Sequence, residues 1–523
     1  DPISEMSGVD NIGKSIGSNG FAFNSNKTKS GKTFLNINTH QPLEGPFSWY
    51  EAHVNSEEGW NMLGGLFPGL PVPVIGTNKN LGWTHTYNYP DMNDIYQLII
   101  NPNNEDEYKI DGTWKIFEIK EVKIKVKIFL GIKINIKRKI LWSDFGPVIK
   151  NKKGYFSFFS QSLNNISAIE QWLKMNKASN FQEFESALKL LGIPRFNIVY
   201  ADNRDNIFFM SNARLSIRNP EIDWDKLVLG NKSSLILDKY HPYNDLPKLL
   251  NPPSGYLFNT NNSPFNSTSK EFNLNELDYP TTFNYKEKEN NRSVRFMELI
   301  KNYEKINYSE FKKIKYDQKY PDSLVLVGNI KSIFDFNDDD VLEYSDLLDL
   351  IKKWDKKGNY NNLGAAQWST YYNFILKELA EKNHNIEDTI PKEYHINALK
   401  KSKKYLLKHF GKIDVILGDL QRHIRGEINL PVSGLIDMIA PSHVRRHENG
   451  RLKVVSGESY IMLVQYSKDD IQIETVLPYG SSSNPKSPHY TDQMKMYVEK
   501  KTKKMTLDKN KIFNEGVRIY NPN

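Results

Sequence analysis

The chain has 523 residues, of which 25% are charged and 12% aromatic, with a formal net charge of +8 and a pI of about 9.0. A single hydrophobic core rarely extends over so many residues, so we expect two or more lobes. The absence of cysteine excludes disulfides, zinc–thiolate sites and cysteine nucleophiles, although it leaves the redox compartment open. No run of 18 apolar residues is present, and the sequence therefore predicts no membrane span.

Strands and turns dominate the pattern from Gly20 to about Ile140. Residues 20–38, GFAFNSNKTKSGKTFLNIN, predict a hairpin with a polar, glycine-containing connection. Residues 120–140, KEVKIKVKIFLGIKINIKRKI, alternate lysine with isoleucine or valine, and this period of two predicts a half-buried strand or hairpin with a lysine-covered outer face. A nucleic-acid-binding patch is the alternative interpretation, but no recognition motif accompanies the basic stretch, and we expect no nucleic-acid partner.

Helical and strand patterns alternate along the rest of the chain. Residues 166–192 have apolar spacings of three and four, which predict two short helices. Strands resume in residues 195–213, where Asn-Arg-Asp-Asn supplies the turn. Residues 292–410 are mainly helical in pattern, and the last hundred residues return to strands. This order predicts an α+β architecture.

A Gly-Ser pair, Gly17-Ser18, stands immediately before the first predicted strand. On its own such a pair is typical of a turn. Here it is followed by NTHQPLEGPFSWYEAHV (38–54), GGLFPGLPVPVIGTNKNLGWTHTYNYPDMNDIY (64–96), NPPSGYLFNTNNSPF (251–265) and VLPYGSSSNPKSPHYTDQMKMY (476–497). In this order and spacing the segments resemble the penicillin acylase family of N-terminal nucleophile hydrolases, which includes penicillin, cephalosporin and acyl-homoserine lactone acylases.

The resemblance implies that Ser18 is a nucleophile made by self-cleavage of the Gly17–Ser18 bond. A serine hydroxyl needs a base, and a free α-amine, with a pKa of about 7.7–8.0, can take its proton at neutral pH. Before cleavage that nitrogen is an amide and cannot do so. Glycine at position 17 is consistent with a strained bond, because glycine tolerates unusual backbone angles.

Two further residues are expected beside the nucleophile. His40, in NTHQP, matches the histidine of the cephalosporin and homoserine-lactone acylases, where the penicillin G enzymes carry glutamine. Its backbone or ring would orient Ser18 and assist proton transfer, although a lone histidine is more often structural. Glu458, in VVSGESY, is the expected carboxylate partner, with a surface glutamate on a strand as the ordinary alternative.

The family also implies donors for the oxyanion of the tetrahedral intermediate. These are the backbone N–H of Tyr87 and the side-chain amide of Asn261, with Asn259 and Asn262 as competitors for the second role. Arg292, in NNRSVRF, matches an arginine that supports the site, and a solvated arginine at a helix start is the alternative.

The segment YPDMNDIY supplies Asp91, Asn93 and Asp94, and some family members bind calcium with a similar segment. Structural calcium is therefore a candidate ligand, and no cofactor is required. The eleven histidines contain no H-E-x-x-H pair.

The implied fold is the four-layer αββα sandwich with a mainly helical insertion. We expect residues 1–17 to form a spacer or the end of an α region, 18–291 the first part of the core, 292–410 the helical region, and 411–523 the strands that complete the core. In the family a long helical α region precedes the cleavage point, so the resemblance implies that an α subunit from the same precursor is a partner.

The leading functional hypothesis is an amide hydrolase that removes an acyl chain from a small N-acyl compound of the acyl-homoserine lactone, β-lactam or lipopeptide type. His40 favours aliphatic acyl chains. The alternative is an uncleaved, non-catalytic relative that acts as a binding or structural protein. The family resemblance implies a periplasmic or secreted location.

Overall fold

The computed structural model describes residues 17–521, apart from 129–130, 164, 287, 327, 338–340, 386–387 and 517. The expected spacer therefore lies outside the described residues, except for Gly17. Ser18 lies in β1 (Gly17–Phe23), which pairs with β2 (Thr33–Pro42) in antiparallel register, with Ser18 opposite Thr39. The hairpin expected over residues 20–38 is confirmed by this pairing.

The sheet that contains β1 has nine strands in the part of the chain that the structure describes. In spatial order its main path is β19 (Tyr256–Asn259), β1, β2, β23 (Leu452–Tyr466), β20 (Gln421–Arg425) and β21 (Ile428–Pro431), to which β22 (Ser442–Arg446), β24 (Ile471–Val476) and β25 (Lys503–Met505) are attached. The two ends of the sequence therefore meet in one sheet, because β2 and β23 are neighbours.

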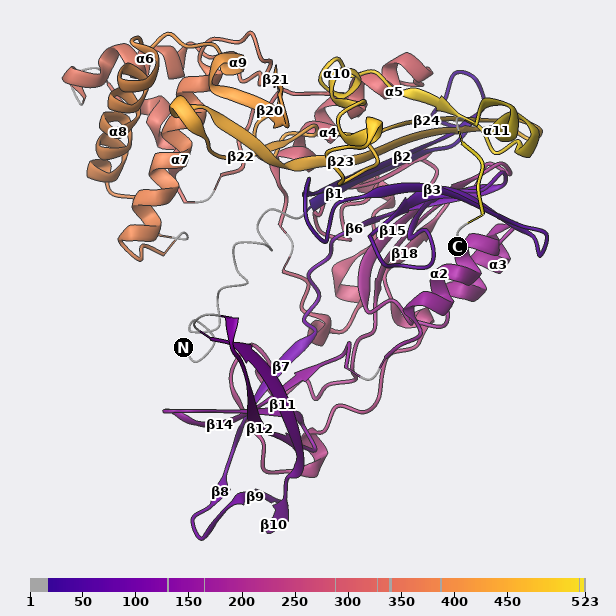
Figure 1. Ribbon diagram of the computed structural model, residues 1–523, viewed down its shortest axis with the longest axis vertical. Helices are drawn as coiled ribbons and strands as arrows, with labels where there is room; N and C mark the ends of the chain where they lie inside the picture. Colours follow the sequence, from indigo (N-terminus) through magenta and orange to yellow (C-terminus); the bar gives the residue numbers. More distant parts are fainter. Residues whose placement is uncertain are drawn as a thin grey trace.

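A second sheet of seven described strands lies against the first (Figure 1). Its order is β18 (Lys248–Leu250), β16 (Ile207–Ala213), β15 (Arg195–Asp202), β6 (Leu81–Thr86), β5 (Ile75–Thr77), β4 (Trp60–Leu66) and β3 (Tyr50–Ser56). The core between the sheets includes Ala22, Leu35 and Val199. The sheets approach closely at Gly20, where an added Cβ would lie 2.7 Å from Thr84 Cγ2, so glycine is required there.

Helices cover the outer faces of both sheets. On the first sheet lie α4 (Asn291–Ile300), α5 (Tyr308–Lys315) and α10 (Met494–Val498). On the second lie α2 (Ala168–Lys177) and α3 (Phe181–Leu188), which confirm the two helices expected in residues 166–192. Because Phe21 packs on Phe296 of α4 while Ala22 faces the other sheet, the apolar run in β1 is buried on both faces.

A helical group stands beside the end of the first sheet (Figure 1). It consists of α6 (Ser345–Lys352), α7 (Ala365–Glu381), α8 (Lys392–Phe410) and α9 (Leu417–Leu420). These helices share their own core, which includes Trp354, Trp368 and Leu399. A short helix, α11 (Lys509–Glu515), lies near the end of the chain.

The mixture of helices and strands confirms the expected α+β class. Among the described residues, the helices lack the length and apolar character that a membrane span needs.

The remaining strands project away from the two large sheets (Figure 1). One group is ordered β11 (Glu118–Lys127), β12 (Lys133–Ser143), β13 (Gly146–Asn151), β14 (Gly154–Ser160), β7 (Asn93–Leu98) and β17 (Val228–Leu229), and the other β10 (Thr113–Ile116), β9 (Asn104–Ile110) and β8 (Ile100–Asn101). The lysine-rich stretch forms the β11–β12 hairpin, but the expectation that it is half-buried is wrong. Its apolar face is exposed as well as its lysine face, with Ile124 48% and Ile134 41% exposed, because this end of the hairpin extends beyond β13.

Candidate active site

Ser18 is buried at the beginning of the central strand β1, next to the bond that the family resemblance marks for cleavage. Its hydroxyl donates a hydrogen bond to the carbonyl oxygen of Gly17, and its backbone N–H donates to Oδ1 of Asn261 at 2.9 Å. The hydroxyl thus lies against the carbonyl group of the Gly17–Ser18 peptide. Oγ therefore lies beside the peptide bond that the family resemblance marks for cleavage.

Asn261 reaches Ser18 because its backbone turns sharply after β19. Its φ of 68° is in the left-handed region, which asparagine tolerates better than most residues. Oδ1 of Asn261 accepts from Ser18 and, at 3.0 Å, from Nη1 of Arg292, while Nδ2 donates to the carbonyl oxygen of Tyr87 at 2.9 Å. The two donors at Oδ1 define which end of the amide faces Ser18. The Nδ2 group, which was expected to serve the oxyanion, is bonded to Tyr87 in this structure.

The competing asparagines bond to the turn after β19, and Oδ1 of Asn259 also accepts from the hydroxyl of Thr86 and from Nδ2 of Asn197 in the second sheet. Oδ1 of Asn259 accepts from the backbone N–H of Asn261 at 2.9 Å, and Oδ1 of Asn262 accepts from that of Thr260 at 2.8 Å. Both side chains therefore shape the turn after β19, and Asn261 is the one in contact with Ser18.

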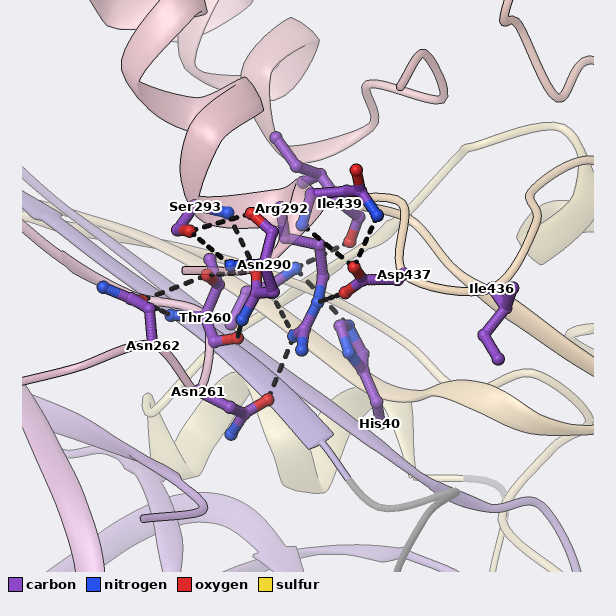
Figure 2. Close-up of polar contacts among 12 residues, drawn as sticks. His40, Thr260, Asn261, Asn262, Asn290, Arg292, Ser293, Ile436, Asp437 and Ile439 are labelled. Carbon is purple, nitrogen blue, oxygen red and sulfur yellow. Dashed lines mark hydrogen bonds and ion pairs between the residues drawn. The ribbon is translucent and has the colours of Figure 1, made fainter. Parts of the chain in front are cut away.

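Arg292 is buried and lies between Asn261 and the carboxylate of Asp437 (Figure 2). Its Nη1 donates to the carbonyl oxygen of Ser18 at 3.0 Å and to Asn261, and its Nε lies 2.9 Å from Oδ1 of Asp437. Arg292 is the second residue of α4, which begins with a capping box between Asn290 and Ser293. This capped start positions the guanidinium over β1, so Arg292 is not a solvated arginine at a helix start.

Asp437 is a site residue that the sequence reasoning missed. Its Oδ1 accepts from Arg292, and its Oδ2 accepts from the backbone N–H and the side-chain amide of Asn291, each at 2.9 Å. Its φ of 58° is in the left-handed region, which aspartate adopts more readily than most residues. A single carboxylate inside the apolar stretch LIDMIA (435–440) is the sequence signal that could have found it.

His40 lies on β2 directly opposite Gly17. Its Nε2 is 3.1 Å from Oδ1 of Asn38 and 3.4 Å from Nδ2 of Asn19. Burial, together with the positive charge of Arg292, lowers the pKa of His40 well below 6.5, so the ring is neutral at pH 7. The ring contacts asparagines next to the nucleophile, and the structure assigns it no hydrogen bond with the Ser18 hydroxyl among the described contacts.

A cavity of about 680 Å³ opens beside these groups. Gly17, His40, Asn261, Arg292 and Asp437 lie on its wall. The cavity has space for a small organic molecule, which a pocket of this size typically accommodates. A substrate in it would be next to the Gly17–Ser18 bond.

Comparison with known proteins identifies the family. A family model described as penicillin amidase matches residues 3–514. The chain belongs to the penicillin amidase family. This match confirms, at the level of the family, the resemblance inferred from the motifs.

Three proteins that resemble this penicillin amidase family member have low sequence identity to it. The acyl-homoserine lactone acylase PvdQ of Pseudomonas savastanoi pv. phaseolicola is 23% identical over 95% of this chain and 69% of its own length. The aculeacin-A acylase of Actinoplanes utahensis is 21% identical over 38% of this chain and 26% of its own length. A solved structure of a thermostable penicillin G acylase from Alcaligenes faecalis matches with a TM-score of 0.67 and 18% identity, covering 96% of this chain and 98% of that chain. The last likeness shows a shared fold.

We expected Glu458 to be the carboxylate partner of His40, and the structure corrects this expectation. Its backbone is opposite His40 in the β2–β23 pair, but its carboxylate forms a buried ion pair with Lys315 at the end of α5. Burial lowers the pKa of Lys315 to about 8 and raises that of Glu458, while each charge opposes the shift of the other. A buried ammonium group needs a counter-charge, and Glu458 supplies it.

The residues expected to hold calcium do not fit such a site. Nη1 of Arg218 lies 2.8 Å from Oδ2 of Asp91, and its Nη2 lies 2.7 Å from Oδ2 of Asp94. The guanidinium thus occupies the place between the two carboxylates where a cation would bind. Asn93 is exposed, and its neighbour Asp94 is buried on the opposite face of β7. Burial raises the pKa of Asp94 to about 6, and the charge of Arg218 opposes this shift.

Proposed function

We propose that this chain is an amide hydrolase that removes an acyl chain from a small N-acyl compound through an acyl-enzyme on Ser18. The observation that carries the proposal is the arrangement of the Gly17–Ser18 peptide. The hydroxyl of Ser18 contacts the carbonyl of Gly17, Asn261 holds the Ser18 nitrogen, and the bond lies at the wall of a cavity. Membership in a family of acylases supports this reading.

The first reaction would be self-cleavage. Oγ of Ser18 attacks the carbonyl carbon of Gly17, the C–N bond breaks as the nitrogen gains a proton, and Gly17 is held as an ester on the hydroxyl. Water then hydrolyses the ester, which leaves a carboxylate on Gly17 and a free α-amine on Ser18. The hydrogen bond from this nitrogen to Oδ1 of Asn261 would hold the new amine in place.

Turnover would use the same hydroxyl on a substrate amide. The α-amine of Ser18 takes the proton from Oγ, which attacks the substrate carbonyl and forms a tetrahedral intermediate. The N–H of Tyr87 and the amide of Asn261 are the proposed oxyanion donors, and for this role Nδ2 of Asn261 must exchange its bond to the Tyr87 carbonyl for one to the oxyanion. The proton passes to the leaving amine, and water then releases the acyl group as a carboxylic acid.

Arg292 and His40 would support the reaction without exchanging protons. Arg292 donates to Oδ1 of Asn261 and fixes it, so that Nδ2 of Asn261 points away from the guanidinium. His40 is neutral and contacts Asn19 and Asn38 beside the nucleophile. Both residues are therefore proposed to orient the site.

The names of the relatives suggest the substrate types. One is an acyl-homoserine lactone acylase and another an aculeacin-A acylase, and the solved neighbour is a penicillin G acylase. Compounds of the acyl-homoserine lactone, lipopeptide and β-lactam types are thus the proposed candidates. An α subunit from the same precursor and a periplasmic or secreted location are part of this proposal.

Mass spectrometry of the purified protein, combined with an amidase assay, tests the function. Processing should yield a chain that begins Ser-Asn-Gly, and this protein should release a carboxylic acid and an amine from N-acyl substrates. An intact Gly17–Ser18 bond in a folded protein without activity would favour the alternative, a non-catalytic relative that acts as a binding or structural protein.

A further inference from the structure

Arg195 is a cation on the wall of the active-site cavity, at the beginning of β15. Its Nη1 donates a hydrogen bond to the hydroxyl of Tyr87, and its Cζ lies 5.0 Å from the centre of the Tyr87 ring. The carbonyl oxygen of Tyr87 in turn accepts from Nδ2 of Asn261. Arg195 is thus separated from the reaction centre by the length of one tyrosine side chain.

The part of the chain that the structure describes supplies no ion-pair partner for Arg195. The cavity wall also carries Lys288, and on the same wall Arg292 is paired with Asp437, Lys286 with Asp225, and Asp91 with Arg218. Among the described residues, no carboxylate lies within the 4.0 Å ion-pair distance of the Arg195 guanidinium. An arginine is charged at every relevant pH and has five N–H donors, of which the Tyr87 contact uses one.

The backbone next to Arg195 has an unfavourable conformation. Phe196 has a φ of 114°, in a region that residues with a side chain rarely adopt. It is held there by a hydrogen bond from its N–H to Oδ1 of Asn88 at 3.0 Å and by ring contacts with His85 and Tyr87. Such strain is typical of functional sites, and here it determines how β15 begins and where Arg195 is placed.

We propose that Arg195 binds a carboxylate group of the substrate. The planar guanidinium matches a carboxylate with two parallel hydrogen bonds, and the partly buried wall strengthens this pairing relative to water. The inference rests on the proposed hydrolase function and narrows its substrates to N-acyl compounds that carry an acid group. The carboxylate could belong to the acyl chain, as in a dicarboxylic monoamide, or to the leaving group, as in an N-acyl amino acid.

Two matched pairs of amides test the proposal and distinguish these sources. Adipoyl-p-nitroanilide and hexanoyl-p-nitroanilide have acyl chains of equal length and differ in a terminal carboxylate. N-hexanoylglycine and N-hexanoylglycinamide differ in the charge of the leaving group. The processed protein should prefer the charged member of at least one pair by about tenfold or more in kcat/KM, as expected for a charge-assisted bidentate contact.

Substitution of Arg195 should remove this preference. In Arg195→Met the ratio of kcat/KM between the charged and neutral members should approach one, and Arg195→Lys should keep part of it because the charge remains. Arg214→Met is the matched control. Arg214 also stacks on a tyrosine, with its Cζ 4.0 Å from the centre of the Tyr240 ring, but it does not line the cavity. Its loss should leave the ratio unchanged.

Several outcomes would overturn the inference. If the wild-type protein hydrolyses these amides without preferring a carboxylate in either pair, the inference fails and the hydrolase function stands. If Arg195→Met lowers kcat/KM equally for both members of the preferred pair, Arg195 acts only by positioning Tyr87. If the processed protein hydrolyses none of the four amides, the proposed function fails for these substrates and the inference fails with it.

Discussion

Nε of Arg292 lies 2.9 Å from Oδ1 of Asp437, a residue 145 positions further along the chain. The same guanidinium holds the carbonyl oxygen of Ser18 and Oδ1 of Asn261. Through Arg292, Asp437 therefore helps to hold two groups beside Ser18. A residue that acts through another residue in this way is a positioning residue.

Asp437→Asn should lower turnover. The substitution keeps the shape but replaces the ion pair with Arg292 by a neutral contact, and loss of about 1.5–3 kcal/mol from a charged hydrogen bond corresponds to a decrease in kcat of roughly 10–100-fold. KM should change less than kcat, and the conservative Asp437→Glu should recover part of the loss. Asp349→Asn, which removes a surface pair with Lys353, is the control and should have no effect. Equal kcat for Asp437→Asn and wild type would exclude the positioning role.

Ser18→Ala should abolish both self-cleavage and hydrolysis, because one hydroxyl serves both reactions. Intact-mass analysis should find a single unprocessed chain, and circular dichroism should show that it is folded. Normal processing and turnover in Ser18→Ala would place the nucleophile elsewhere.

Asn261→Ala in a processed protein should lower kcat by about 10²–10³-fold, the usual effect of deleting one oxyanion donor.

The rate should rise with pH through the pKa of the Ser18 amine, about 7.7–8.0 for a free terminus. The neutral amine accepts the proton, so activity is present above this pKa and is lost as the pH falls through it. Because the pKa of His40 is far below 6.5, the ring stays neutral over this range and adds no limb near pH 6.5. His40→Ala should lower the rate but keep the amine-dependent limb. A single limb near pH 4 would indicate a carboxylate base instead.

Glu458→Gln should destabilise the protein by about 3–5 kcal/mol, because it leaves Lys315 buried without a counter-charge. Urea unfolding measures this loss. The double variant Lys315→Met with Glu458→Leu should recover most of it, since a buried ion pair can be replaced by apolar side chains. The pH–rate profile of processed Glu458→Gln should keep the wild-type limb. A shifted limb would instead indicate that Glu458 acts on the catalytic groups.

Calcium and chelators should leave the thermal unfolding temperature unchanged, because Arg218 already pairs with Asp91 and Asp94. Arg218→Met should lower stability by about 3–5 kcal/mol, since it leaves Asp94 buried without its partner. Arg214→Met is the control, because it removes a half-buried arginine to which the described residues supply no ion pair. A rise in the unfolding temperature of the wild-type protein with added calcium would contradict the arginine-filled arrangement.

Local patterns in the sequence were sufficient for the class of fold, and they singled out Ser18 as the proposed nucleophile. The spacing of apolar residues predicted α2 and α3, and the polar connection after Phe23 predicted the β1–β2 hairpin, because these features depend on neighbours in the chain. Ser18 could be singled out because the order of the motifs around it was specific. The lysine-rich hairpin was only partly predicted, since period two indicates a strand but does not say whether another element covers its apolar face.

The tertiary structure decided which side chains meet. Glu458 pairs with Lys315, Arg292 with Asp437, and Asp94 with Arg218, over separations of more than a hundred residues. A sequence pattern describes periodicity along one segment, whereas these pairs form because α4, α5 and the loops after β16 and β21 pack onto particular strands. Buried charges must find partners wherever the packed elements place them. For that reason the sequence by itself could propose Ser18 as the nucleophile, and the groups around Ser18 became visible only in the folded chain.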